Sequence, residues 1–497
     1  MARNILPERS QGAADLLARA EPRRVLIVPI DFAKETHVVQ FAKGSAGYLL
    51  KRPLNVRNDL SGSQFLQDRI AGCRAKYRIP MGNVLIGGEE VPEYAMNFVL
   101  SLELAGYRVV RVNAKDARKY RTNSRAASDA LALDGIAEAI RLRRAYDIQA
   151  HDGLYGALKM AGRARRTLRR QITATRNRIH KDVELLCPGL LNEKLSGLPA
   201  FGPGSLALME SGCSVQRLRR MSAAVLARRL AKAGTHKPCE VAARLKAFAA
   251  SALAPDPELV PYRQGTLARK VGLLRTLQTA LADEEEEMAR CLVRTPAFLL
   301  TSIPGLGVAL AGGIVGEYGD PERWLDTDRM MSYVGLAVRQ HQTGGPGSAP
   351  VVVGLPVDAN HVLKDLLLQA AFHVGTTVHP AWRELGLPGC HPLREYYRRL
   401  EQRGGHSRMG TARKLLRIAG AMVRGRSVYL PAEALHPAAD GPMPPARLCE
   451  YLRVVRGMLL EKWKPYDLSG IPDEENQLKL WLQEIDRIVA FVNTQDK

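Results

Sequence analysis

Acidic side chains follow apolar, strand-like runs at separate places in the first 150 residues. Asp31 ends one such run and Glu89 ends another, while Asp129 and Asp134 lie at the start of an amphipathic, helix-like segment. Carboxylate oxygens are the ligands that Mg²⁺ prefers, and two such ions can stabilise the attacking and leaving oxygens of a phosphodiester. Taken singly, each acid would be an ordinary solvated group. The order strand-Asp, strand-Glu, helix-Asp predicts a site for Mg²⁺ (or Mn²⁺) and phosphodiester chemistry.

A single hydroxyl stands in a polar turn far downstream. Thr343 lies between Gln342 and the pair Gly344–Gly345. Flexible glycines beside a hydroxyl suit a nucleophile that must approach a substrate, but they also suit an ordinary surface turn. Ser348, in the same turn, is a second candidate nucleophile. The sequence around the turn leaves both interpretations open.

Basic residues gather in one helix-like segment, "MAGRARRTLRRQITATRNRIHKDVELL" (160–186). Cations without acidic partners repel one another, so phosphate contact is favoured here over a solvated helix face. The eight residues concerned are Arg163, Arg165, Arg166, Arg169, Arg170, Arg176, Arg178 and Lys181.

Two further segments are suited to DNA backbone contact. In "IPGLGVALA", Gly305 and Gly307 could expose backbone N–H groups at a helix start, as in a helix-hairpin-helix; a tight helix–helix turn is the alternative. In the stretch 391–418, tyrosines alternate with cations, which suits backbone contact combined with stacking. The cations expected to bind there are Arg408, Arg413 and Lys414.

The elements that must position these groups follow from hydrophobic patterning. Apolar or alternating runs at 25–30, 37–41, 83–90 and 107–114, followed by the helix-like segment 128–142, indicate an α/β domain. Leu267, Val271, Leu274 and Leu281 share one face of a long helix or coiled coil, whereas the acidic run 283–287 fits a solvated face. The expected divisions are a leader (1–22), an α/β domain (23–150), a helical linker or coiled coil (151–296), a C-terminal domain (297–430) and a helical tail without chemical clues (431–497).

Charge and composition point to a nucleic-acid partner. The 497 residues include 72 Lys and Arg against 50 Asp and Glu, a net charge of +22. A positive field of this size most often serves nucleic-acid binding. The seven cysteines are scattered without a CxxC pair, which argues against a zinc site or a disulfide scaffold. Without an apolar run long enough to span a bilayer or a signal-peptide pattern, a cytoplasmic protein without membrane contact is expected.

Four segments together resemble the DEDD transposases of the insertion-sequence-110 class, the bridge-RNA-guided recombinases. "IDFAKETHVV" is similar to a D-x-x-K-x-x-H-x-V opening and gives Asp31 as an acid and Lys34 as a residue expected to contact nucleic acid. "GGEEVPEYAMNFV" is similar to a G-x-E-x-x-x-x-Y segment and gives Glu89, with Glu90 as the alternative. "RAASDALALDGIAEAI" stands where the family has K-T-D-x-x-D, and "MSYVGLAVRQHQTGG" where it has an S-G-G turn. These matches give Asp129 as an acid and Thr343 as the nucleophile.

The resemblance implies an architecture and a mechanism. It implies an RNase H-like (RuvC-like) α/β N-terminal domain, a helical or coiled-coil middle, and a mainly α C-terminal domain with a helix-hairpin-helix. Asp31, Glu89 and Asp129, with Asp134, would bind Mg²⁺, and the Thr343 hydroxyl would attack DNA. A structured non-coding RNA would choose the sequences to be joined. A homodimer or homotetramer would assemble on DNA, in a bacterial cytoplasm and at the nucleoid.

Three departures from the family pattern leave other functions open. Ala132 occupies the position of the last carboxylate, and Asp134 lies two residues further, on the opposite side of a helix. Thr343 replaces serine, and "PGSAPVVVGLPVDANH" replaces a basic stretch. One alternative is a catalytically impaired descendant that still binds RNA and DNA. The other is a metal-dependent junction nuclease that uses only the N-terminal carboxylates.

Overall fold

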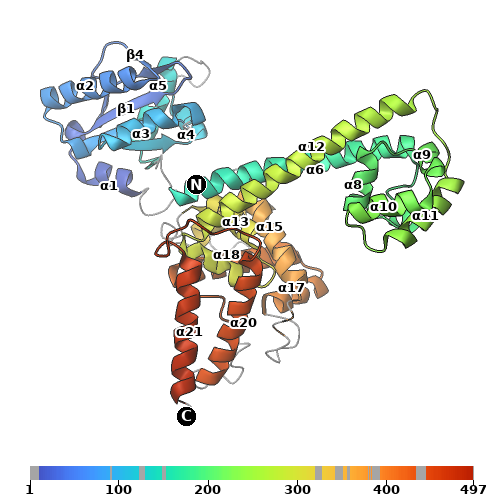
Figure 1. Cartoon of the computed structure of the whole chain (residues 1–497). Helices are drawn as coiled ribbons and strands as arrows, with labels where there is room; N and C mark the ends of the chain where they lie inside the picture. Colours follow the sequence, from blue (N-terminus) through green and yellow to red (C-terminus); the bar gives the residue numbers. More distant parts are fainter. Residues whose placement is uncertain are drawn as a thin grey trace. The chain divides into compact units, whose positions relative to one another are not determined.

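The computed structural model of the chain describes most of its residues and divides them into two compact units. The described residues are 11–89, 92–121, 129–147, 153–319, 327–337, 339–341, 351–354, 359–378, 380, 382, 392–431 and 444–495. One unit comprises residues 1–159, 291–465 and 469–497, and the other comprises residues 160–290 and 466–468. The first unit contains an α/β domain and a C-terminal helical domain (Figure 1).

A mixed seven-stranded sheet forms the centre of the α/β domain. Its strand order is β4-β2-β1-β5-β6-β7, and β3 pairs with β1 beside β2. Strands β1, β5 and β6 run parallel, whereas β2 is antiparallel to β1. The strands are β1 (Leu26–Asp31), β2 (Thr36–Val39), β3 (Ala42–Lys43), β4 (Leu54–Arg57), β5 (Val84–Gly88), β6 (Arg108–Val112) and β7 (Ala145–Asp147).

Helices cover both faces of this sheet. One face packs on α2 (Leu60–Tyr77) and α3 (Met96–Leu104), and the other packs on α1 (Gln11–Arg19), α4 (Ala114–Lys119) and α5 (Asp129–Arg141). The expected leader is therefore wrong for residues 11–19. Ala13 is 1% exposed in the core beside α5, because the small and apolar side chains of α1 gather on one side of that helix.

The second unit is built on two long antiparallel helices, α6 (Leu154–Leu186) and α12 (Val260–Leu292). Their direction follows from two ion pairs: Asp182 of α6 bonds Lys270, and Arg165, nearer the start of α6, bonds Glu285, nearer the end of α12. Both helices match the sequence-based expectation, although a coiled coil is not confirmed. The chain between them, residues 187–259, forms a knob of five short helices: α7 (Glu193–Ser196), α8 (Pro203–Glu210), α9 (Val215–Arg220), α10 (Ala223–Lys232) and α11 (Pro238–Ser251).

The C-terminal domain is mainly helical, with one two-stranded sheet. The element before the "IPGLG" turn is the 3₁₀ helix η5 (Pro296–Ser302), so the expected helix-hairpin-helix is not confirmed. None of the helices in the described ranges is both long and apolar enough to cross a membrane. The other elements are α13 (Val308–Tyr318), α14 (Thr327–Val334), β8 (Arg339–His341), β9 (Val351–Gly354), α15 (His361–Thr376), α17 (Pro392–Gln402), α18 (Ser407–Arg424), α20 (Pro445–Trp463) and α21 (Gln477–Gln495).

Candidate functional site

Two of the predicted carboxylates lie side by side along the sheet. In the parallel ladder between β1 and β5, Ile30 pairs with Gly88. Asp31, the last residue of β1, and Glu89, the first residue after β5, therefore follow the same rung of the ladder. Neighbouring strands are about 4.8 Å apart. The fold thus brings together two acids that are 58 positions apart in the chain.

The alternation of side chains places both acids on the face that carries α5. Ile27 of β1 and Leu85 of β5 belong to the core formed with α5. The buried residues that alternate with them along each strand belong to the core formed with α2 and α3. Successive side chains in a strand point to opposite faces, so Asp31 and Glu89 share the face of Ile27 and Leu85. The carboxyl edge of the sheet is therefore acidic on the side where a third acid from α5 could join.

Arg121 bridges this acidic edge and α5. Its Nη2 atom lies 3.2 Å from Glu89 Oε1, and the side chains are 15% and 33% exposed respectively. A Cβ added at Gly135 of α5 would lie 3.0 Å from Arg121 Cγ and 2.0 Å from the carbonyl oxygen of Ala117. The missing side chain at position 135 therefore lets α4, Arg121 and α5 approach closely. Arg121 belongs to none of the motifs that the sequence displays.

Helix α5 runs away from the acidic edge, with its first residue nearest to it. At the far end of the helix, Arg141 Nε donates to the carbonyl of Lys43 at 3.0 Å, and Lys43 pairs with Leu26 at the opposite end of β1 from Asp31. Asp129, the first residue of α5, is thus directed toward the Asp31 end of the strand. The structure does not describe the side chain of Asp129.

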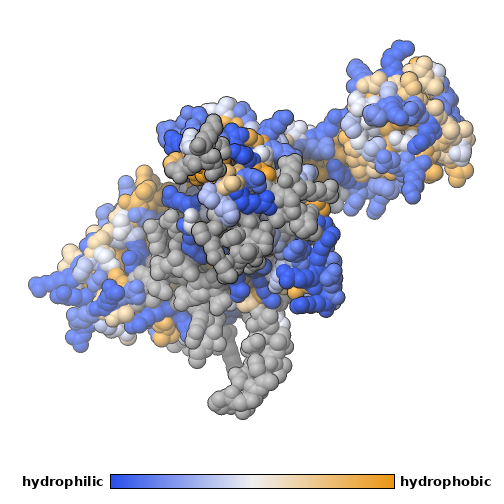
Figure 2. Space-filling model, turned by 90° about the horizontal axis from the view of Figure 1, so that it is seen from below, coloured by the Kyte–Doolittle hydropathy of each residue, from blue (hydrophilic) through white to orange (hydrophobic). Residues whose placement is uncertain are grey.

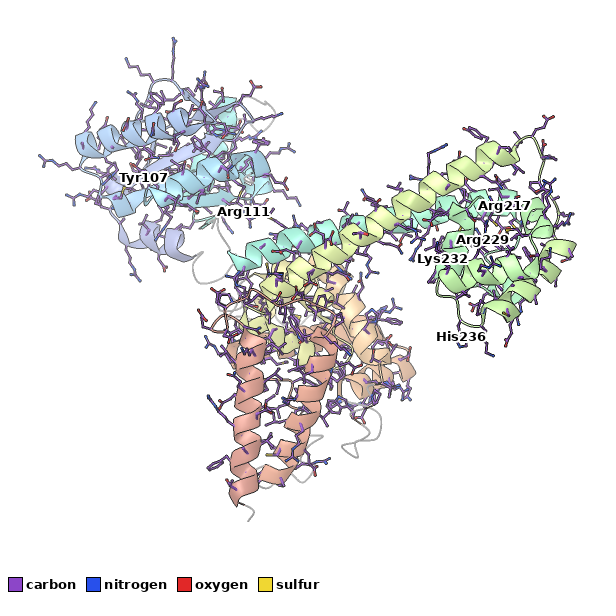
Figure 3. All side chains as sticks on the ribbon, in the orientation of Figure 1. Tyr107, Arg111, Arg217, Arg229, Lys232 and His236 are labelled. Atoms are coloured by element: carbon purple, nitrogen blue, oxygen red, sulfur yellow. The ribbon has the colours of Figure 1, made fainter. Side chains whose placement is uncertain are left out.

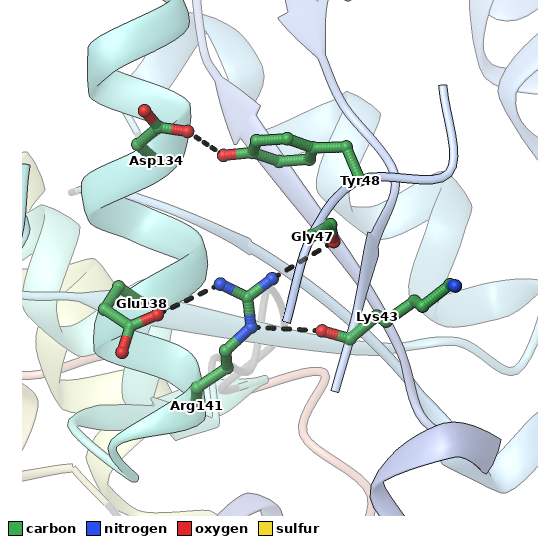
Figure 4. Close-up of polar contacts among 6 residues, drawn as sticks. All are labelled: Lys43, Gly47, Tyr48, Asp134, Glu138 and Arg141. Atoms are coloured by element: carbon green, nitrogen blue, oxygen red, sulfur yellow. Dashed lines mark hydrogen bonds and ion pairs between the residues drawn. The ribbon is translucent and has the colours of Figure 1, made fainter. Parts of the chain in front are cut away.

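Asp134 is held against a different part of the domain. Its carboxylate accepts a hydrogen bond from the hydroxyl of Tyr48, as Figure 4 shows. Tyr48 bridges Ala42, which pairs with Ile27 near the start of β1. Burial first, and then the Asp134 carboxylate, raise the pKa of Tyr48. Ala132, at the position of the family's last acid, is 8% exposed within the core.

The turn after Asp31 is fixed from beneath by His37. The side chain of His37 is fully buried, its Nδ1 accepts the backbone N–H of Ala33 at 3.1 Å, and the rings of Phe32 and Phe98 lie edge-on to it. Burial lowers the pKa of His37 below its usual value of 6.5. His37 belongs to the quoted opening motif, yet only its burial shows that it positions the turn. Lys34, predicted to contact nucleic acid, is exposed in this turn.

In the described side chains, no group of three or more His, Cys, Asp or Glu could hold a metal ion. Glu90 and the side chain of Asp129 lie outside that description. The two neighbouring carboxylates at positions 31 and 89 supply hard oxygen donors, which suit Mg²⁺. The described residues therefore fit part of a divalent cation site.

The predicted phosphate-binding turn of the C-terminal domain is packed on its neighbours. A Cβ at Gly305, which has a φ of +82°, would lie 2.7 Å from the carbonyl oxygen of His373 in α15. This close approach supports the alternative in which the glycine serves packing. Gly307, the N-cap of α13, is exposed, and an added Cβ would meet no atom within 4 Å. Only Gly307 is therefore open to a ligand.

A lysine from the tail organises the carbonyls of the same turn. Lys462 Nζ donates to the carbonyl oxygens of Thr301, Ile303 and Leu306 at 2.5, 2.8 and 3.0 Å. Burial lowers the pKa of Lys462 to about 7. The tail, which the sequence left without a role, thus supplies a lysine whose protonated form has one donor for each of the three carbonyls.

A basic pocket lies in the same domain. It has a volume of about 660 Å³, and its cations are Arg413, Lys414 and Arg417 of α18. Arg413 Nε donates to the carbonyl of Leu336 at 2.7 Å, and Lys414 lies over the ring of Tyr396 at 4.8 Å. Arg408 lies outside the pocket lining, 4.6 Å from the ring centre of Phe372. Both predicted nucleophiles, Thr343 and Ser348, lie outside the described residues.

The basic helix α6 is partly neutralised within the chain. Glu285 of α12 accepts from Arg165 Nε at 2.7 Å and from Arg169 Nη2 at 3.1 Å, and the guanidinium of Arg176 lies 5.3 Å from the ring centre of Phe201. The expectation of uncompensated cations is thus wrong for Arg165 and Arg169. The acidic run 283–287 is likewise more than a solvated face, because it supplies their partner.

Other cations of the helix remain on its surface. Arg166 is half-buried, while Arg163, Arg170, Arg178 and Lys181 are exposed. Among the residues that the structure describes, Arg170, Arg178 and Lys181 form no ion pair. These three cations are the ones best placed to contact a polyanion.

Two family profiles match the chain. Residues 28–188 match the DEDD transposase domain of IS110 elements, described as "Transposase", and residues 297–386 match "Transposase IS116/IS110/IS902 family". No curated protein matches the chain. The first profile covers the acidic edge and all of the sheet except the first two residues of β1, and its domain type is RNase H-like. The chain therefore belongs to the IS110 family of transposases, enzymes of DNA transposition and recombination.

Proposed function

We propose that this transposase is a metal-dependent, RNA-guided recombinase that exchanges DNA strands through the hydroxyl of Thr343. The observation that carries the metal-dependent part is the pairing of Ile30 with Gly88, which sets Asp31 beside Glu89. Two carboxylates at neighbouring strand ends repel each other, so they do not stabilise the fold by themselves. A divalent cation bound between them would offset this repulsion.

Asp31, Glu89 and Asp129 would hold Mg²⁺ or Mn²⁺, and Asp134 is a fourth candidate. When bound, these ions would offset the negative charge that develops on the attacking and leaving oxygens. Arg121 already offsets one charge at Glu89, with its Nη2 atom 3.2 Å from the carboxylate. Asp134 would join the site only after breaking its bond with Tyr48.

Thr343 would act as the nucleophile. Its Oγ would form a bond to phosphorus as the bond between phosphorus and the leaving oxygen breaks, and the threonyl proton would pass to that oxygen. The resulting phosphothreonyl link would conserve one phosphoester bond for attack by the hydroxyl end of another strand. The pocket of Arg413, Lys414 and Arg417 lies in the same domain and would hold a DNA phosphate.

RNA guidance is supported by positive surface on α6, where Arg170, Arg178 and Lys181 are exposed. The test is to purify the protein from a host that carries its native flanking DNA and to sequence the bound RNA. We expect one structured RNA whose sequence matches that flank. Heterogeneous RNA, or none, would contradict guidance and leave an unguided DNA-binding protein.

A catalytically impaired, RNA- and DNA-binding protein is the second candidate. It is favoured by the burial of Ala132 where an acid is expected and by the bond between Asp134 and Tyr48. In this case Thr343→Ala would leave every transposition phenotype unchanged. A metal-dependent junction nuclease would differ again, because Asp31→Asn would abolish cutting while Thr343→Ala would not.

A further inference from the structure

The five helices of the knob at the end of α6 and α12 lie outside both matched ranges, and the knob has a groove of its own. Its helices share a core with the two long helices, in which Leu226 and Leu230 of α10 pack with Leu245 of α11. Between α8 and α10 lies a cavity of about 530 Å³, with Leu208 and Leu230 among its apolar lining. The knob is thus a folded part of the chain that carries an open, shaped surface.

Every charged side chain that lines this groove is a cation. Arg217 of α9 and Arg229 and Lys232 of α10 contribute to the lining, and no acid does. Figure 3 shows these three residues, with His236 beyond them, along one side of the knob. In the view of Figure 2 the surface of the knob mixes hydrophilic and apolar side chains. The lining of the groove therefore combines apolar and positively charged side chains.

Two of these cations are available to a ligand. Arg229 and Lys232 are exposed and, within the fully described knob, form no ion pair or side-chain hydrogen bond. Other cations of the knob are used internally. Arg219 donates to the carbonyls at the end of α11, at 2.7 Å for Ala249, and Lys246 donates to the carbonyls at the end of α9, at 2.6 Å for Arg219.

The groove's third cation is held in place, and Glu210, the acid that precedes the lining residue Ser211, is neutralised. Arg217 Nη1 donates to the carbonyl oxygens of Ser211 and Gly212, which fixes the guanidinium at the groove. Glu210, the last residue of α8, is bonded by both Nε and Nη2 of Arg275. The positive potential of the groove is therefore not cancelled by its own helices.

The side chains that line the groove suit the phosphate backbone of a duplex better than unpaired bases. Residues three apart on a helix, such as Arg229 and Lys232, have Cβ atoms about 5–6 Å apart, which compares with one to two nucleotide steps of about 3.4 Å along a strand. The lining contains no aromatic side chain on which an unpaired base could stack. Cations without a stacking platform suit sequence-independent contact with phosphates of paired strands.

We propose that the α8–α10 groove of the knob binds the phosphate backbone of double-stranded DNA through Arg217, Arg229 and Lys232. This contact uses no residue of the acidic edge and does not involve Thr343, and it requires neither metal nor guide RNA. It would extend the hold of the transposase on DNA beyond the regions that the family profiles cover.

The test compares duplex binding by the full-length chain and by the Arg229→Ala/Lys232→Ala variant across a salt series without divalent metal. If both residues contact phosphates, the variant's plot of log K for duplex binding against log salt concentration has a slope less negative by about 1.8. This is about 0.9 for each lost contact. The matched control is Lys194→Ala/Arg244→Ala, which removes two exposed knob cations that do not line the groove. We expect the control to keep the wild-type slope.

Three results would overturn the proposal. They are an unchanged slope for the groove variant, an equal change in the control, and a loss confined to hairpin or single-stranded RNA with duplex DNA binding intact. Because both groove residues are exposed on a helix surface, circular dichroism and thermal unfolding should match the wild type. Failure of strand exchange would count against Thr343 or the metal site but would leave this binding result untouched.

Discussion

Asp31 and Glu89 end neighbouring parallel strands at the same rung, because Ile30 pairs with Gly88 in the ladder between β1 and β5. Alternation then directs both carboxylates to the face covered by α5. A Cβ at Gly88 would lie 2.4 Å from the ring of Phe32, so a side chain at that position would disturb the rung itself. The acidic edge is therefore a product of sheet register and close packing.

Removal of either acid should abolish strand cleavage while DNA binding persists. Asp31→Asn and Glu89→Gln each keep the size of the side chain but lose a negative oxygen donor. Since loss of an outer-shell partner alone typically costs 10–100-fold, loss of a direct ligand should reduce cleavage by more than about 100-fold. Cleavage of a labelled duplex and Mn²⁺ titration by calorimetry would measure the two effects. Full activity in either variant would remove that residue from the site.

Asp134 and Asp129 should respond differently to the loss of charge. Asp134 is bonded to Tyr48 and lies more than one helical turn beyond Asp129. We therefore expect Asp129→Asn to abolish cleavage and Asp134→Asn to change it by no more than a few-fold. Tyr48→Phe, which releases the Asp134 carboxylate, is the companion variant. A large rise in cleavage or Mn²⁺ affinity in Tyr48→Phe would show that Asp134 is a ligand restrained by the tyrosine.

Acid should loosen the turn that follows Asp31. Burial lowers the pKa of His37 below 6.5, so below that pH the unfolded state binds a proton that the folded state still excludes. The contribution of His37 is complete above pH 6.5 and decreases as the pH falls through its folded-state pKa. In the wild type, the β1–β2 amides should be less protected from hydrogen exchange at pH 5 than at pH 7. His37→Phe, which cannot titrate, should show a smaller change, and an equal change would contradict this role.

Lys462 should make the stability of its surroundings depend on pH in the neutral to alkaline range. The folded-state pKa of about 7 lies below the ordinary 10.5, so the unfolded state holds one more proton between these values. Stability around the 301–306 turn should therefore rise with pH from about 7, by on the order of 1 kcal/mol per pH unit. The contribution is complete above pH 10.5 and is lost as the pH falls to about 7.

The comparison variant for this effect is Lys462→Met. It leaves three turn carbonyls without their donor, which should cost about 1–3 kcal/mol for each unsatisfied group. Hydrogen exchange of the η5 amides at pH 6.5 and pH 9 would report both the loss and its pH dependence. If the protection of the η5 amides changed equally with pH in the wild type and the variant, the carbonyls would be keeping Lys462 charged from pH 6.5 to pH 9. That result would contradict the predicted titration of Lys462.

Patterns within single segments predicted much of the fold. The apolar runs gave β1, β5 and β6 with ends shifted by one or two residues, and amphipathic periodicity gave α5, α6 and α12. The neighbouring positions of the two acids at the sheet edge also follow from the sequence pattern, because the carboxyl ends of parallel strands meet at one edge. Strands β3, β4 and β7 were not predicted, since they are two to four residues long and partly polar.

Contacts between distant segments could not be predicted from local patterns. Tyr48 and Asp134 are 86 positions apart, Arg165 and Glu285 are 120 apart, and Lys462 and Thr301 are 161 apart. The local sequence instead suggested a metal ligand at Asp134, a phosphate contact at Arg165 and a solvated face at Glu285. Only the packing of whole elements decides that an acid neutralises a basic helix or that a lysine enters the core.

The most direct test of the account is to trap the bond between protein and DNA. The wild-type chain, its copurified RNA, Mg²⁺ and a matching DNA duplex would be incubated, denatured and digested, and the DNA-linked peptide identified by mass spectrometry. We predict a phosphodiester link on Thr343 that is absent from both Thr343→Ala and Asp31→Asn. A link on Ser348, or strand cleavage that persists in Thr343→Ala, would contradict the role of Thr343 as the nucleophile.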